Sequence, residues 1–382
     1  EIAITCMGLI LSILGDHLKD NLEESLKILL DRLKNEITRL TAVKAFAQIA
    51  ASPLQIDTSL VLNDVLNEMA TFLRKQNRQL KQATLTSLSV IVQNPASHKA
   101  VTALSDTILK EDAALISDSD LHLSHLALRL ATAILHVNTS SAAIIQSTVL
   151  PQCLELLKST LLQGMALESM LAFFEQMVKV NAKQLSFESL LETLVNLVHK
   201  KTGDLSRQSI LSIAQCIAVI VASKPESVSG TVNRFVSDLK GGKDDSIKLL
   251  AVYTLGEVGR RVDLSDNKDL RKVVLAAFED ASEDVKTGAS VALGNIAIGN
   301  MGAVLPDIFT EIKAHPKKQY LLLGSLREVI VRQSGTKGGV SALSTYFDQF
   351  LTVLFNNTQS EEEGTRNVVS ECLGKLALIN PE

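Results

Sequence analysis

One spacing recurs along this chain: a pair of apolar residues, three positions apart, returns about every 40 residues. Successive pairs start 33 to 47 residues apart, and the 327 residues from Phe46 to Leu373 give eight steps of about 41. Repeats of this length with two helices per unit are typical of HEAT and armadillo arrays. The sequence therefore predicts an all-α fold, an α-solenoid of antiparallel helix pairs. The nine pairs are Phe46/Ile49, Leu88/Ile91, Ala131/Ile134, Phe174/Met177, Ala214/Ile217, Leu255/Val258, Leu293/Ile296, Leu326/Val329 and Leu373/Leu376.

Each unit is predicted to consist of a helix A, a short turn and a helix B that carries the apolar pair. Residues 57–75 form the clearest helix A, and residues 77–93 form its helix B, which ends at Asn94-Pro95 because proline cannot continue the hydrogen-bond ladder. Two other A helices are expected to open on Pro151 and Pro306, in a first turn that needs no N–H donor. One face of the first A helix collects Leu60, Val61, Val65, Leu66 and Met69.

This pattern predicts one continuous array of about nine units over residues 1–382, since each unit of a solenoid contacts only its neighbours. The chain begins with Glu1 inside an expected helix and ends at Asn380-Pro381-Glu382. Neither end has the polar outer face that caps a free array. We therefore expect a segment of a longer solenoid.

Composition limits the classes of partner. The net charge is −4, with 38 basic and 42 acidic residues, which argues against a direct nucleic-acid binder. There is no run of 18 apolar residues, so no membrane partner is expected. The four cysteines, Cys6, Cys153, Cys216 and Cys372, are far apart and form no CxxC motif, as expected for reduced thiols in a cytoplasmic and nuclear protein.

No motif in the sequence predicts catalysis. His122 and His125 are one helical turn apart, but no third ligand completes a metal set. Gly256-Glu257-Val258-Gly259 lies in a helical pattern and not in a strand-to-helix phosphate loop. We therefore predict a protein that is not an enzyme and that has no metal, no cofactor and no small-molecule substrate.

A basic side chain stands seven residues before the apolar pair in six of the nine units. Seven residues are two helical turns, so these charges lie near the start of each B helix on a shared face. Two interpretations stay open: contacts that satisfy helix ends in the next unit, or a positive stripe that faces an acidic partner. The six residues are Arg39, Lys81, Arg207, Lys248, Lys286 and Arg366.

One stretch of the sequence is specific: residues 362–369 (EEGTRNVV), continued by residues 371–376 (ECLGKL). Other specific stretches lie at residues 39–45, 51–57, 71–75, 245–251, 255–259 and 318–323. These stretches resemble the cullin-associated, neddylation-dissociated protein family, which is known for HEAT repeats, whereas residues 99–152 match that family least well. The resemblance places this chain in the middle-to-late part of the family's arch.

The resemblance implies a regulator that wraps an unmodified cullin together with its RING subunit. Such a protein blocks neddylation of the cullin and promotes exchange of adaptor–substrate-receptor modules. The family's extreme N-terminal repeats and its adaptor-competing β-hairpin lie outside this sequence. The chain alone is therefore expected to bind cullin weakly and not to complete the exchange.

Geometry suggests where a partner would bind, because B helices line the concave face of such arrays. Exposed polar residues there are the candidate partner-binding residues: Arg78, Lys81, Lys286, Lys317, Lys318, Arg366 and Asn367.

Two other hypotheses about the function of the chain remain open. One is another HEAT adaptor, such as a nuclear transport receptor, which would bind a small GTPase, or a phosphatase scaffold. The other is a helical region of a large lipid-kinase-like enzyme, whose kinase signature would lie elsewhere in the parent chain.

Overall fold

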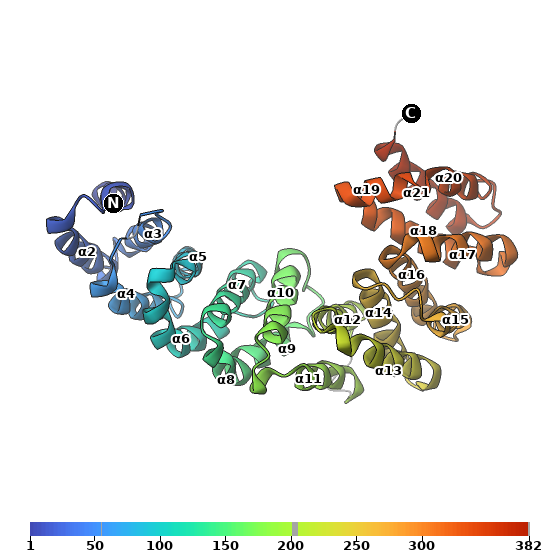
Figure 1. Ribbon diagram of the computed structural model, residues 1–382, viewed down its shortest axis with the longest axis horizontal. Helices are drawn as coiled ribbons and strands as arrows, with labels where there is room; N and C mark the ends of the chain where they lie inside the picture. The colour runs from blue at the N-terminus through green and yellow to red at the C-terminus, as the bar shows by residue number, and fades with distance from the viewer. Residues whose placement is uncertain (55, 201–204, 381–382) are drawn as a thin grey trace. The chain divides into compact units, whose positions relative to one another are not determined.

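The computed structural model describes residues 1–54, 56–200 and 205–380 (Figure 1). All regular elements in these residues are helices, which confirms the predicted all-α class. Gln55, in one of the family-like stretches, and Pro381-Glu382 lie outside the described residues. The chain divides into two compact units, unit 1 (Glu1–Thr193) and unit 2 (Leu194–Glu382). One continuous array of about nine units over residues 1–382 stays a prediction.

The predicted B helices form, each around one apolar pair. In unit 1 they are α3 (Arg39–Ala50), α5 (Arg78–Gln93), α7 (Leu121–Val137) and α10 (Gly164–Val180). In unit 2 they are α12 (Arg207–Ala222), α14 (Asp245–Arg261), α16 (Glu283–Gly299), α18 (Gln319–Ser334) and α21 (Glu363–Ile379). Every residue of the nine pairs is buried except Leu373, which is half-buried. The pairs therefore mark the apolar face along which each B helix packs against its neighbours, which we call the seam.

Unit 1 places its B helices in one row and its A helices in another. The row begins with α1 (Ile2–Leu14), which packs on α3, and continues through α5, α7 and α10. The outer row consists of α2 (Lys19–Lys34), α4 (Ser59–Phe72) and α6 (His98–Ala113). It continues into α8 (Ala142–Ile144), a single π-helical turn (Ile145–Val149) and α9 (Leu150–Leu156). The boundary between the units falls within α11 (Phe187–His199).

Unit 2 repeats this arrangement. The B helices α12, α14, α16, α18 and α21 contact one another in sequence order. Outside them lie α13 (Val228–Gly241), α15 (Lys268–Ala276) and α17 (Met301–Ala314), then α19 (Lys337–Ser344) and α20 (Phe347–Phe355). Phe309 of α17 meets Phe350 of α20 edge to face, with ring centroids 5.4 Å apart. Among the described helices, none alone is long and apolar enough to cross a membrane. Only α12 and the segment Pro225–Gly241 together reach that length and apolarity, and a bend of 115° separates them.

Two local predictions were wrong. Pro306 lies inside α17 and not in its first turn, because the Asn300 side chain accepts a hydrogen bond from the Ala303 N–H over 3.1 Å and starts the helix earlier. Leu60 is 54% exposed, since the buried face of α4 is set by Val61, Val65 and Met69, four residues apart. Pro151 does lie in the first turn of α9.

Glycines bring the middle helices of unit 2 into backbone contact. A Cβ on Gly256 of α14 would lie 2.7 Å from Ala292 Cα of α16. A Cβ on Gly294 of α16 would lie 2.5 Å from the Ser325 carbonyl oxygen and 2.8 Å from Glu328 Cβ of α18. These separations are shorter than van der Waals contact, so only glycine allows the helices to approach this closely.

We expect Gly294→Ala to destabilise unit 2, although alanine gains about 1 kcal/mol of helix propensity over glycine. Overpacking against the α18 backbone costs roughly 1–3 kcal/mol and outweighs that gain. The matched control is Gly374→Ala in α21, where a Cβ meets nothing within 4 Å and the propensity gain should stabilise the protein. Urea unfolding of both variants measures the difference; stabilisation by Gly294→Ala would contradict the close packing.

Unit 1 buries one carboxyl group without a partner. Asp112 of α6 is 0% exposed, and neither carboxyl oxygen has a hydrogen-bond partner among the described residues. Burial raises its pKa well above the ordinary value of 3.8. A buried charge without a counter-charge is unfavourable, so this site favours the protonated acid.

Asp112 should therefore weaken the fold as the pH rises. The native protein holds this proton more tightly than the unfolded chain, so stability falls with pH from about 3.8 upward to the raised pKa. We expect Asp112→Asn, which stays neutral, to be more stable than the wild type at pH 8 and nearly equal to it at pH 4. Thermal unfolding across this range tests the expectation, and a constant difference between the two proteins would contradict it.

Candidate partner-binding surface

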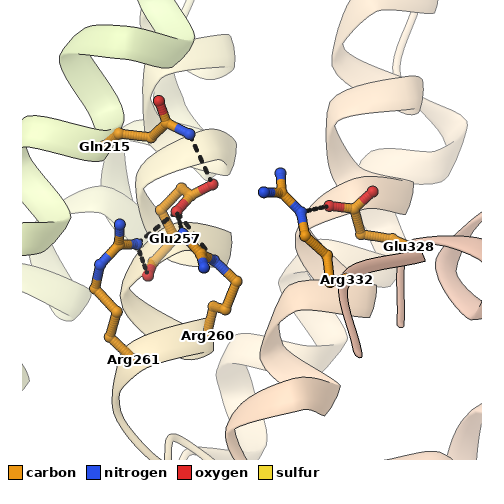
Figure 2. A network of polar contacts seen from close by, with 6 residues as sticks. All are labelled: Gln215, Glu257, Arg260, Arg261, Glu328 and Arg332. Carbon is orange, nitrogen blue, oxygen red and sulfur yellow. Dashed lines mark hydrogen bonds and ion pairs between the residues drawn. The ribbon is translucent and has the colours of Figure 1, made fainter. Parts of the chain in front are cut away.

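The most deeply buried ion-pair cluster of unit 2 centres on Glu257 of α14 (Figure 2). The Glu257 side chain is 1% exposed, and its Oε2 lies 2.7 Å from Arg260 Nη2 and 2.5 Å from Arg261 Nη1. Arg261 also donates to the Glu257 carbonyl oxygen over 2.9 Å. Gln215 of α12 donates to Oε1 over a long 3.4 Å. Glu257 thus joins two neighbouring B helices and two cations of its own helix.

Charge pairing is strong enough to reverse the effect of burial on Glu257. Burial by itself would raise the pKa of this carboxyl group, but Arg260 and Arg261 together hold the pKa below its ordinary value of 4.5. Burial also lowers the pKa of Arg261. The carboxylate is therefore ionised at neutral pH, and the guanidinium groups next to it keep it so.

A second pair of the same kind lies on α18. Arg332 Nε donates to Glu328 Oε1 over 2.7 Å, and Figure 2 shows the Arg332 guanidinium on the side of α18 that faces the Glu257 group. Burial would lower the pKa of Arg332, but Glu328 and, more weakly, Glu257 raise it. The pairs of α14 and α18 therefore belong to one electrostatic cluster, which we call the arginine cluster: Glu257, Arg260, Arg261, Glu328 and Arg332.

The repeat explains why the two pairs face each other. Glu257 and Glu328 each lie two residues after the first apolar residue of their unit, and Arg261 and Arg332 lie six residues after it. The spacing of four places each glutamate and its arginine on one helical face, with the acid nearer the N-terminus, which is the favoured order. The intervening helix α16 carries Asn295 and Gly299 at these two positions. Its short side chains leave room for the long ones of α14 and α18.

The seven residues predicted from the sequence lie elsewhere, at or just before the N-terminal ends of B helices. Arg78 and Lys81 are in α5 of unit 1, and Lys286, Arg366 and Asn367 are in α16 and α21 of unit 2. Lys317 and Lys318 form part of a 3₁₀ turn (Pro316–Lys318) before α18. These residues are divided between the two units, and their role in partner binding stays a prediction.

Four of the six cations among these seven residues already have acceptors. Arg78 lies 2.5 Å from Asp120, the N-cap of α7, and Lys318 lies 2.9 Å from Glu279. Lys286 pairs with Glu283 of its own helix, and Arg366 donates to the carbonyl oxygens of Ser360 and Glu361. Lys317 and Asn367 are exposed. Such exposed pairs contribute little to stability.

The basic residues that stand seven positions before the apolar pairs bind groups near helix ends in several units. Lys248 at the start of α14 pairs with Asp280 over 2.8 Å, and Arg207 at the start of α12 pairs with Asp284 at the start of α16 over 2.8 Å. Arg39 lies over the Phe72 ring, 5.2 Å from its centroid. These contacts favour the structural interpretation for those three residues.

Unit 1 has an open groove between α5, α7 and α10, with a volume of about 670 Å³. Val92, Ala133 and Ala172 are among its apolar lining residues, and Arg129 and Glu168 carry opposite formal charges. His98 and His136 also line the groove, and no single kind of charge dominates it.

His122 and His125 lie on α7, with ring centroids 6.2 Å apart. Nδ1 of His125 is 2.6 Å from Ser169 Oγ, so one ring nitrogen is occupied by a hydrogen bond. Within the residues that the structure describes, no three His, Cys, Asp or Glu side chains come together as a metal site.

Glu257→Gln should destabilise the chain by about 3 kcal/mol at pH 7, because a neutral amide leaves two partly buried guanidinium groups without a counter-charge. The wild-type contribution is present above the ordinary pKa of 4.5 and is lost as the pH falls through the lowered value. The two proteins should therefore converge in acid. Thermal unfolding at pH 7 and pH 3 tests this, with the exposed Glu283→Gln as a nearly silent control. Equal stability of Glu257→Gln and wild type at pH 7 would refute it.

Solved structures with a similar fold include Kap95p in a structure with RanGDP. It matches with a TM-score of 0.56 and 12% identity, over 93% of this chain and 46% of that one. Kap121p bound to Pho4p also matches with a TM-score of 0.56 and 12% identity, over 93% of this chain and 38% of the other. At this low identity the likeness concerns the fold alone. This likeness in fold confirms the predicted α-solenoid.

No family model matches the chain. Cullin-associated NEDD8-dissociated protein 1 of Arabidopsis thaliana is 45% identical over 390 residues, covering 100% of this chain and 32% of the relative. The protein of the same name from Dictyostelium discoideum is 40% identical, over 100% of this chain and 31% of that protein. The mouse Cullin-associated NEDD8-dissociated protein 2 is 37% identical over 386 residues. Over its whole length the chain thus matches a segment of the cullin-associated NEDD8-dissociated proteins, and it spans about a third of their length.

Proposed function

We propose that this chain is part of a scaffold that binds unmodified cullin–RING ubiquitin ligase cores, blocks neddylation of the cullin and promotes exchange of adaptor–substrate-receptor modules. The observation that carries the proposal is the 45% identity, over the whole chain, to a protein named for its association with cullin and its dissociation by NEDD8. Identity at this level, in a repeat fold that varies freely outside its apolar seams, supports a shared partner as well as a shared fold.

Architecture supports a binding role over a catalytic one. A row of parallel B helices offers a long surface made of many similar segments, and solenoids use such surfaces to hold large partners. The ionisable groups of the arginine cluster form ion pairs with each other. In this proposal the chain is a scaffold and not an enzyme, working in the cytoplasm and nucleus.

Length sets the expected strength of binding. The chain spans about a third of the relatives that it matches, so its contacts would be one part of a wrapping interface. Affinity in such interfaces is distributed over several anchors, and a part alone binds more weakly than the whole.

A nuclear transport receptor remains the alternative, since Kap95p and Kap121p share the fold. At 12% identity this likeness gives no evidence about a binding partner. The alternative function would require binding of a small GTPase such as Ran. The two functions are therefore separable by a single binding assay with both partners present.

Immobilised chain should capture an unmodified cullin–RING core in preference to the same core carrying NEDD8. The physical reason is that the modifier adds bulk to a surface which the scaffold would cover. Ran in both nucleotide states serves as the competing partner. Equal capture of both forms of the core, or capture of Ran alone, would contradict the proposal. Capture of the core by the full-length Arabidopsis relative but not by this chain would show that the grip lies outside this segment.

A further inference from the structure

Two guanidinium groups of the arginine cluster keep hydrogen-bond donors that no described residue uses. Arg260 directs Nε and Nη2 at one oxygen, Oε2 of Glu257, over 3.3 and 2.7 Å. Arg332 uses only its Nε, which donates to Glu328. A guanidinium carries five N–H donors, so Arg260 retains its Nη1 edge and Arg332 retains both of its Nη groups.

The cluster also carries more positive than negative charge. Three arginines face two glutamates, and the best-buried carboxylate, Glu257, is shared by Arg260 and Arg261. Exposure is graded: the Glu257 side chain is 1% exposed, Arg260 is 27% exposed and Arg332 is 39% exposed. The unbalanced charge therefore lies at the solvent edge of the cluster, where a partner can reach it.

Two other ion pairs of unit 2 lack this surplus. Lys248 and Asp280 match one to one, as do Arg207 and Asp284. In each of these pairs the acid lies outside the helix of the cation and neutralises it: Asp280 lies in the loop before α16 and Asp284 lies in α16. The arginine cluster differs because three arginines share two acids, and Glu257, which also acts on Arg332, is already bound by Arg260 and Arg261.

We propose that Arg260 and Arg332 together form an anchor for a carboxylate side chain of the protein partner, held between α14 and α18. This inference rests on the proposed function and names the chemistry that one part of that interface recognises. Two guanidinium forks from opposite sides match the planar, two-oxygen carboxylate. A phosphate dianion fits less well, because Glu257 and Glu328 would repel its second charge.

The guanidinium groups of Arg260 and Arg332 are preorganised to bind a carboxylate. Glu257 and Glu328 hold the two arginines by charged hydrogen bonds, so little side-chain freedom is lost when a partner binds. The flanking carboxylates also keep the free chain from attracting anions indiscriminately. Arginine at a partly dehydrated centre is the type of residue that dominates interface energies.

The test compares binding of the unmodified cullin–RING core to the chain and to the variants Arg332→Gln, Arg332→Lys and Arg260→Gln/Arg332→Gln. Arg74→Gln is the matched control, since Arg74 belongs to unit 1, forms an ion pair with Glu111 and is 65% exposed. Dissociation constants are measured at several salt concentrations, and thermal unfolding confirms that each variant is folded.

We expect Arg332→Gln to weaken binding about tenfold and the double variant to weaken it further, with a shallower salt dependence in both. Arg332→Lys should keep the salt dependence but recover only part of the affinity, because it retains the charge without the fork. Arg74→Gln should bind like the wild type. Folded variants that bind the core as the wild type does would overturn this anchor and leave the proposed function standing. Failure of the wild-type chain to bind the core would overturn the anchor, and failure of the full-length Arabidopsis relative as well would overturn the proposed function.

Discussion

The fold depends on one contact repeated along each unit: the apolar seam of a B helix packed against the seam of the next. Each seam is built from a pair of residues such as Leu255 and Val258, both almost fully buried. A single helix pair cannot bury its apolar stripe alone, so stability comes from neighbour on neighbour. The seam also determines which side of every B helix stays outside the core, and with it where charged residues can gather.

Much of this fold can be predicted from the sequence, because the seam is a periodic signal. The nine apolar pairs mark nine B helices, and Asn77 caps α5 where the pattern requires a helix to start. The errors arose where local chemistry outweighed periodicity. Pro306 was expected in a first turn, yet a side-chain cap from Asn300 begins α17 five residues earlier. Leu60 is apolar but lies off the face that α4 buries.

The arginine cluster was harder to predict, for a physical reason. Its signal, Glu257 to Arg261 and Glu328 to Arg332 at the same distance from their apolar pairs, is present in the sequence. Salt bridges at this spacing, however, are common on helix surfaces. The pattern also does not reveal that the short side chains of α16 allow the charged groups of α14 and α18 to interact. Basic residues at helix starts are the more visible signal in the sequence, and the structure pairs one of them, Arg78, with Asp120.

The glycine contacts of unit 2 have a mechanical consequence. Solenoids bend by small slips between neighbouring repeats, and a layer of long side chains can adjust its rotamers to accommodate such slips. Between α14 and α16, Gly256 removes that layer, and Gly294 does the same between α16 and α18. These three helices should therefore move as a stiff plate. Compliance should concentrate at seams with longer side chains, such as the one between α18 and α21, where Leu373 is only half-buried. An anchor placed on the plate would keep its geometry while the neighbouring repeats flex.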